Sequence, residues 1–183
     1  MLKPGRIGMS LAEVLVALAI LALLAASLYP AVFGQWQKGQ ATALANQLEN
    51  VRTAVQNYRD NVQRYPRTLA QLTNALTATA TDACAQVVPP GNRNMWRGPY
   101  LTQNVVDSLR VGDAIVLDTL IRSPATQALG LIAELQVNAL NVEQSAATEL
   151  EQRYESVTNF GAGIILYTPG TRTLTFQIRI RGC

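Results

Sequence analysis

The run from Val14 to Phe33 contains about twenty residues and no charged side chain. As an α-helix it would extend about 30 Å, which matches the hydrocarbon core of a bilayer. Lys3 and Arg6 precede the run, and few charges follow it closely. Because basic residues are retained on the cytoplasmic side, this arrangement predicts a single membrane span with a cytoplasmic N-terminus and an exported remainder.

One acidic residue, Glu13, stands at the front of this run. A charged side chain costs about 2.5–3.5 kcal/mol at the centre of a membrane helix and less near its edge, so an acid here indicates a function. A plain signal anchor gives no reason for it. A secretory signal peptide cut near "LLAAS" fits the basic front, but it leaves an apolar run that continues well past the cut.

The residues in front of Glu13 supply a third interpretation. A short basic leader, "MLKPGRIG", ends in glycine and is followed by "MSLAEVLVALAIL", in which Glu13 would be the fifth residue. This N-terminus resembles the class III signal of type IV pilins and type II secretion pseudopilins. The resemblance implies that a prepilin peptidase cuts between Gly8 and Met9 and methylates the new amine of Met9. It also implies that Glu13 meets the N-terminal amine of a neighbouring subunit in a filament, and that the helix bends or melts near Pro30.

A second pattern follows the apolar run. Apolar residues recur at alternating steps of four and three, which is one stripe of an amphipathic α-helix. We therefore predict one long helix from about Ser10 to Tyr58 or Asn61, with its first half in lipid or a filament core and its second half packed on a globular domain. A short coiled coil is the alternative for the second half. The stripe consists of Leu44, Leu48, Val51, Val55, Tyr58 and Val62.

Two later segments extend the resemblance over about the first 100 residues. "QNYRDNVQRYPRTLAQL" is similar to the end of the helix in major pseudopilins, and "MWRGPYL" is similar to the segment before their sheet. The family fold is α+β, with a long N-terminal helix packed on a small antiparallel β-sheet. The chain would then divide into a leader (residues 1–8), a transmembrane and polymerisation helix (9–33), its amphipathic continuation (34–62) and a globular head (63–183).

The head carries shorter patterns. Leu174, Phe176, Ile178 and Ile180 alternate with polar residues, as in a half-buried antiparallel strand, and this is the clearest β signal of the chain. The segment Ala128–Leu140 is ambiguous between helix and strand. A short helix is predicted over Thr68–Leu76, followed by a loop over Thr77–Arg97. Strands are predicted over Ala114–Ile121, Gly163–Thr168 and Thr173–Arg181, and a "PGT" hairpin joins the last two. A helix is predicted over Asn141–Ser156, with Asn141 as its N-cap.

The chain has two cysteines, Cys84 and Cys183. They are too few for a structural zinc site, but they can form one disulfide if the head lies in an oxidising compartment. Such a bond would close a loop of about 100 residues, worth about 4.7 kcal/mol in the chain-entropy model. Two unrelated thiols are the alternative, and the export signal favours the bond.

Composition excludes several classes of function. The absence of histidine removes Ser-His-Asp and Cys-His catalysis and the usual histidine metal sites. Asp107, Asp113 and Asp118 are irregularly spaced, as solvated carboxylates are, and no cofactor motif is present. The net charge is +3, of which Lys3 and Arg6 supply two, so the near-neutral remainder gives little support to nucleic-acid binding. We predict no enzymatic activity, no cofactor and no metal.

The resemblance also has a limit. Major pseudopilins of type II secretion carry an aspartate-rich calcium-binding loop near the C-terminus, whereas no Asp or Glu follows Glu155 here. We therefore expect a minor or specialised subunit of a type IV pilus-like or type II secretion filament. Its expected partners are other pilin or pseudopilin subunits, prepilin peptidase and an inner-membrane assembly platform.

The expected location is the bacterial inner membrane, as a single-pass protein with a periplasmic head, and afterwards a periplasmic or extracellular filament. Two alternatives come from other classes of protein. One is a monomeric membrane-anchored periplasmic binding protein that uses the helix only as a tether. The other is a DNA-binding minor pilin of a competence system.

Overall fold

The computed structural model describes residues 11–103, 105, 107–123, 132–155 and 163–181. The chain forms two compact units, Met1–Gln37 and Lys38–Cys183, which we describe separately. Helix α1, Leu11–Val62, contributes its first part to one unit and its second part to the other. The prediction of one long helix is therefore confirmed, with its end within a few residues of the predicted position.

The first part of α1 is apolar and exposed. Its most apolar 18-residue window has a mean hydropathy of 2.6, and none of that window is buried inside the molecule. By length and composition this segment can cross a membrane. Pro30 lies inside the helix, which is continuous through it. The predicted bending near Pro30 concerns the assembled filament and stays a prediction.

The second part of α1 buries its apolar stripe. Leu44 is 2% exposed, and the other five residues of the predicted stripe are fully buried. Ala41, Ala45 and Ala54 are buried beside them, so small side chains alternate with large ones along the contact. Because the stripe packs within its own unit, the alternative of a coiled coil is not needed to explain it.

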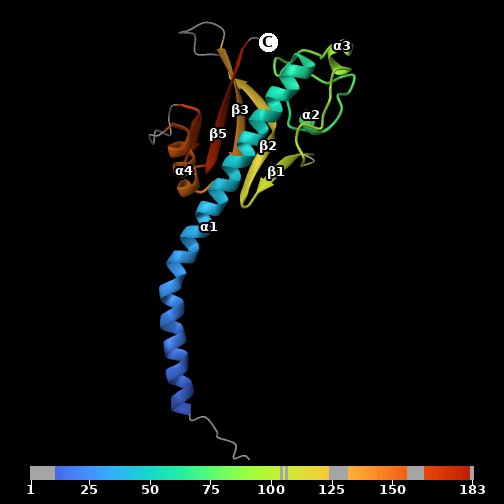
Figure 1. The fold of residues 1–183 in the computed structure, drawn as a ribbon. Helices are drawn as coiled ribbons and strands as arrows, with labels where there is room; N and C mark the ends of the chain where they lie inside the picture. The colour runs from blue at the N-terminus through green and yellow to red at the C-terminus, as the bar shows by residue number, and fades with distance from the viewer. Residues whose placement is uncertain (1–10, 104, 106, 124–131, 156–162, 182–183) are drawn as a thin grey trace, which may run out of the picture. The chain divides into compact units, whose positions relative to one another are not determined.

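The partner of the stripe is a five-stranded antiparallel sheet (Figure 1). The strands stand in the order β1-β2-β3-β5-β4, so β5 lies between β3 and β4. The predicted hairpin is confirmed, since β4 and β5 pair from Thr168 and Thr173 onward and Arg172 takes a positive φ of 51° in the turn. The strands are β1 (Ser108–Val111), β2 (Ala114–Ser123), β3 (Ile132–Leu140), β4 (Ile165–Thr168) and β5 (Thr173–Arg181).

Strand β5 has the predicted bounds and the predicted faces. Leu174 and Phe176 are fully buried, and Ile178 and Ile180 are at most 4% exposed. These side chains belong to the same core as the stripe on α1. The predicted α+β fold, a long N-terminal helix packed on a small antiparallel sheet, is confirmed.

The short elements differ from the predictions. Helix α2 covers only Ala70–Thr73, because Asn74 is already extended. The predicted loop contains one further turn of helix, α3 (Pro90–Arg93). Strand β1 was not predicted, and the ambiguous segment before Leu140 is a strand over its described part, β3.

Helix α4, Gln144–Glu155, confirms the last predicted helix, but the predicted N-cap is wrong. Asn141 precedes the helix by three residues and has a positive φ of 58°. Its side-chain amide donates to the backbone oxygen of Asp113 at 3.0 Å. Asn141 therefore holds the turn after β3 against the β1–β2 connection, and the first intrahelical bond runs instead from the N–H of Ala147 to the oxygen of Glu143.

Tyr58 is the largest side chain of the stripe and it is fully buried. Its ring meets Tyr100 edge to face at 5.9 Å between centroids. Its hydroxyl has no hydrogen-bond partner among the described residues. Burial, followed by the charges of Tyr100 and Asp82, raises the pKa of Tyr58 above its ordinary value of 10.0.

We predict that Tyr58→Phe leaves the free energy of unfolding unchanged or raises it by up to about 1 kcal/mol, because it removes a buried hydroxyl without a partner. The wild-type protein should also lose stability above about pH 10, since Tyr58 ionises in the unfolded chain but stays neutral when folded. Urea unfolding of the detergent-solubilised protein between pH 8 and 11 measures both effects. Tyr65→Phe, at a partly exposed ring, is the control and should keep the alkaline loss; a destabilised Tyr58→Phe would contradict the assignment.

Candidate functional site

The first turn of α1 carries the predicted assembly residue. Glu13 is exposed there, as are its neighbours Leu11 and Leu15. The positive end of the helix dipole favours an acid at this position. Gly8 and Met9, the predicted cleavage pair, lie outside the described residues.

The surface around Glu13 is uniformly apolar. Val14, Leu15, Val16 and Leu18 expose between 41% and 60% of their area. Water does not favour such a surface, so this part of α1 needs lipid or other helices around it. In either environment the carboxylate of Glu13 favours an opposite charge nearby.

The two segments that resemble major pseudopilins meet in the head. Asn61, near the end of α1, donates to the hydroxyl of Tyr100 at 3.1 Å, and that hydroxyl also accepts from the backbone N–H of Arg97 at 2.9 Å. Trp96 stands edge to face with Tyr100 and donates to the backbone oxygen of Gln71. The "MWRGPYL" segment therefore packs against the end of the helix and the start of the following chain.

The loop that contains Cys84 is organised by a buried acid. Asp82 is 2% exposed, and one of its oxygens accepts the N–H groups of Cys84 and Gln86, each at 2.9 Å. Its other oxygen pairs with Arg64 at 3.2 Å. Cys84 thus has a fixed position, whereas Cys183 lies outside the described residues, so the disulfide stays a prediction.

Asp107, Asp113 and Asp118 do not form a metal site. Asp118 accepts the N–H of Ala70 at 2.7 Å and so caps the start of α2 from β2. Burial raises the pKa of Asp118, although this hydrogen bond acts in the opposite direction. Asp113 accepts from Gln40 of α1 at 3.3 Å. Within the described part of the chain, no group of three or more His, Cys, Asp or Glu side chains could hold a metal ion.

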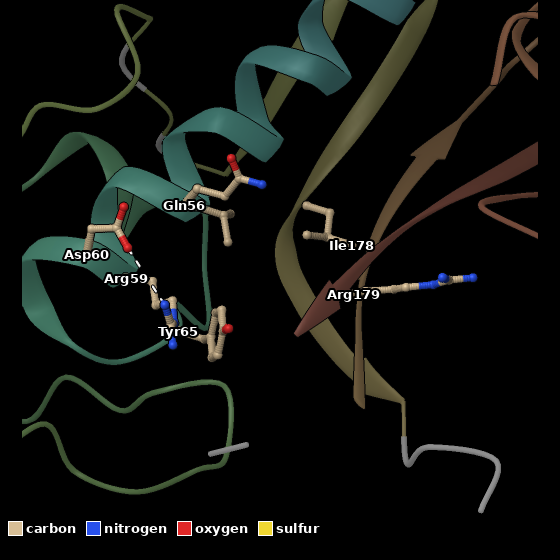
Figure 2. A pocket seen from close by; sticks show the side chains of 7 residues that line it. Gln56, Arg59, Asp60, Tyr65, Ile178 and Arg179 are labelled. Carbon is tan, nitrogen blue, oxygen red and sulfur yellow. Dashed lines mark ion pairs between the residues drawn. The ribbon is translucent and has the colours of Figure 1, made fainter. Parts of the chain in front are cut away.

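Sequence reasoning missed a groove between α1 and β5, which we call the β5 groove (Figure 2). Its main hollow has a volume of about 450 Å³, and a second one of about 160 Å³ adjoins it through shared residues. No sequence signal could have found it, because its two walls are more than 100 residues apart in the chain. The lining residues are Arg52, Val55, Gln56, Arg59, Asp60, Tyr65, Ile164, Gln177, Ile178 and Arg179.

Two family models match this chain. Residues 4–29 match the prokaryotic N-terminal methylation motif, and residues 31–110 match type II secretion system protein G. The chain belongs to the type IV pilin-like and pseudopilin family. No curated protein and no solved structure matches it.

The matches agree with the predicted resemblance and with its predicted extent over about the first 100 residues. This pseudopilin-type chain carries the methylation motif over residues 4–29, which include the front of α1. The second match ends at residue 110, so β2 to β5 and α4 lie outside both matches. The family consists of structural secretion-system subunits and is not an enzyme family.

We predict that Cys84 and Cys183 are joined in the exported pseudopilin. Alkylation of the unreduced, denatured protein should then add nothing, and after reduction it should label both cysteines. The double variant Cys84→Ser/Cys183→Ser should unfold at a free energy lower by about 2–5 kcal/mol, as small secreted domains do when they lose a native disulfide. Labelling of both thiols without reduction in protein purified from the envelope would contradict the pairing.

Proposed function

We propose that this protein is a filament subunit that a prepilin peptidase cuts after Gly8 and that assembles through the first part of α1. The observation that carries the proposal is the match of residues 4–29 to the N-terminal methylation motif, on a helix whose first turn holds an exposed Glu13. The fold supports it, since a small α+β head on a long helix suits a subunit that joins others through its helix.

The topology of the proposal follows from the charges near the span. Lys3 and Arg6 would keep the leader in the cytoplasm, where the peptidase acts on it, and the head would lie in the periplasm. The apolar part of α1 would anchor the unassembled subunit in the inner membrane. An assembly platform in that membrane and other pilin or pseudopilin subunits are the partners that such a subunit needs.

The chemistry of assembly rests on a pair of charges. Cleavage after Gly8 would give Met9 a positive amine, and methylation would leave that charge in place. Glu13 follows four residues later, which would be the same side of a helix that began at Met9. In a bundle of such helices, the amine of one subunit would compensate the carboxylate of another, and assembly would reduce the cost of holding a charge in lipid.

A minor or specialised role is supported by the part of the head outside the family matches. No Asp or Glu follows Glu155, so the acidic loop expected of a major type II pseudopilin is missing from the sequence. Helix α4, between β3 and β4, occupies a part of the head beyond residue 110. These differences affect the head and leave the proposed assembly residues unchanged.

Intact mass tests the processing step. We expect the envelope protein, reduced before analysis, to lack its first eight residues and to carry one added methyl group. Gly8→Val, or deletion of the peptidase, should give the uncut chain because the glycine before the cut is lost or the enzyme is absent. An uncut wild-type chain in cells with active peptidase, or a cut near Ser27, would contradict the proposal and favour the tether or the ordinary signal peptide.

Substitution of Glu13 tests the assembly step. Glu13→Gln keeps the size of the side chain and removes its charge, so we expect at least about a tenfold loss of filament-incorporated protein, equivalent to about 1.4 kcal/mol. The measurement is the amount of protein in the sheared or cross-linked filament fraction, with the total membrane amount held equal.

Glu49→Gln is the matched control, because Glu49 is an exposed acid in the second part of the same helix. It should assemble like the wild type. Normal incorporation of Glu13→Gln, with cleavage intact, would contradict the role of Glu13 in assembly. Absence of the wild-type protein from the filament fraction would favour the monomeric binding protein.

A further inference from the structure

The two edges of the sheet are covered to different extents by neighbouring parts of the chain. Beyond β1, strand β2 is covered by residues 67–69, because Leu69 donates to Asp118 and Leu120 donates to Arg67. At the opposite edge, β4 pairs with β5 only from Thr173 to Phe176. Beyond that, the N–H of Gln177 donates to the backbone oxygen of Ile164. No described strand pairs with this side of Ile178–Arg181.

The open stretch offers hydrogen-bonding groups at its edge. In an antiparallel strand, successive residues direct their N–H and C=O groups to alternate sides. The backbone N–H of Gln177 points toward β4. The backbone groups of Arg179, two residues later, therefore point to the same edge. The four residues Ile178–Arg181 extend about 13 Å, which is enough for a short added strand.

The start of β4, next to the open stretch of β5, is held in place by helix α4. The Glu155 side chain, at the end of α4, accepts the N–H groups of Ile164 and Ile165, the latter at 2.9 Å. The first residues of β4 are therefore held in position, and the open edge begins where they stop. An added strand there would continue the line of β4 along β5.

The β5 groove runs beside this edge and supplies two kinds of surface. Its apolar lining residues are Val55 and Ile178, which are 0% and 4% exposed, and the partly exposed Ile164, which supplies the accessible apolar surface. Its charged lining residues are three arginines, Arg52, Arg59 and Arg179, and one acid, Asp60. The lining is therefore positive, which favours an acidic occupant.

The arginines flank the edge on both faces of the sheet. In Figure 2, Ile178 points toward α1 and Arg179 points away from it. Arg59 stands on the α1 side, 5.7 Å above the ring of Tyr65 and 3.7 Å from Asp60. Arg179 is exposed, and no ion pair among the described side chains joins it to Glu134, its neighbour across β3.

A second copy of the same edge is a poor occupant. Two β5 edges paired about a twofold axis would bring Arg179 close to its own counterpart, and like charges placed opposite each other are unfavourable. The same charge protects the edge against pairing between copies. An acidic segment of a different polypeptide would meet no such repulsion.

We propose that the open edge of β5 and the β5 groove bind an extended acidic segment of another polypeptide, which adds to the sheet as a further strand. Its backbone would pair with Arg179, its apolar side chains would face Ile164, and its carboxylates would lie near Arg59 and Arg179. Main-chain pairing supplies affinity in this mode, and side-chain contacts supply specificity. The proposal concerns the head alone and does not depend on processing or on filament assembly.

The test uses the full chain in nanodiscs of zwitterionic lipid and a fluorescent peptide with the sequence Glu-Val-Asp-Val-Glu-Val-Asp. Fluorescence anisotropy should show saturable binding that weakens with salt. Arg179→Glu and Arg59→Glu should each weaken it at least tenfold. Arg110→Glu is the matched control and should bind like the wild type, because Arg110 is an exposed arginine in β1, at the opposite edge of the sheet.

Two further probes separate strand addition from simple charge attraction. Arg179→Pro removes the edge N–H but keeps the bonds to β3, so it should abolish binding if the peptide adds as a strand. The same peptide with alternate amides methylated should also fail to bind. Equal binding of the methylated peptide, or no binding by the wild type, would overturn the proposal.

Other occupants give different results. Binding of a single-stranded oligonucleotide with the same dependence on Arg59 and Arg179, and no binding of the peptide, would assign the groove to nucleic acid and overturn the proposal. Concentration-dependent self-association that Arg179→Pro removes would assign the edge to a second copy and would also overturn it.

Discussion

The contact between the apolar stripe of α1 and the sheet is the interaction on which the head depends. Six stripe residues from Leu44 to Val62 are almost fully buried, and the inward side chains of β5 belong to the same core. The end of the helix also organises the following chain, since the oxygen of Val62 accepts the amide of Asn92 at 2.8 Å. One helix face therefore determines where the sheet and the loop after it can lie.

The same helix meets two different surroundings, and its sequence changes accordingly. Before Gln37, apart from Glu13, it is largely apolar and exposed, which suits lipid or a bundle of identical helices. After Lys38 it is apolar on one side only, which suits a sheet and water. The first part of α1 and the head can thus be altered separately, and the tests of Glu13 and of the β5 groove address different halves of one helix.

Sequence alone predicted the elements with long or regular patterns. The stripe on α1 and the alternation along β5 were correct because each is repeated over several turns or residue pairs. Strand β1 was missed because four residues carry too little periodicity, and the N-cap at Asn141 was wrong because a contact with Asp113 holds that residue in the preceding turn. The β5 groove could not be predicted, because the packing that brings its distant walls together is not encoded locally.

The position of β5 in the sheet has a consequence for the order of folding. Strands β3 and β4 both pair with β5 and not with each other, although β5 follows both along the chain. A chain that emerges from its N-terminal end therefore presents α1, β2 and β3 before the strand that completes the sheet has appeared. The core of the head therefore cannot close until the C-terminal strand is available, so its completion depends on the last part of the chain.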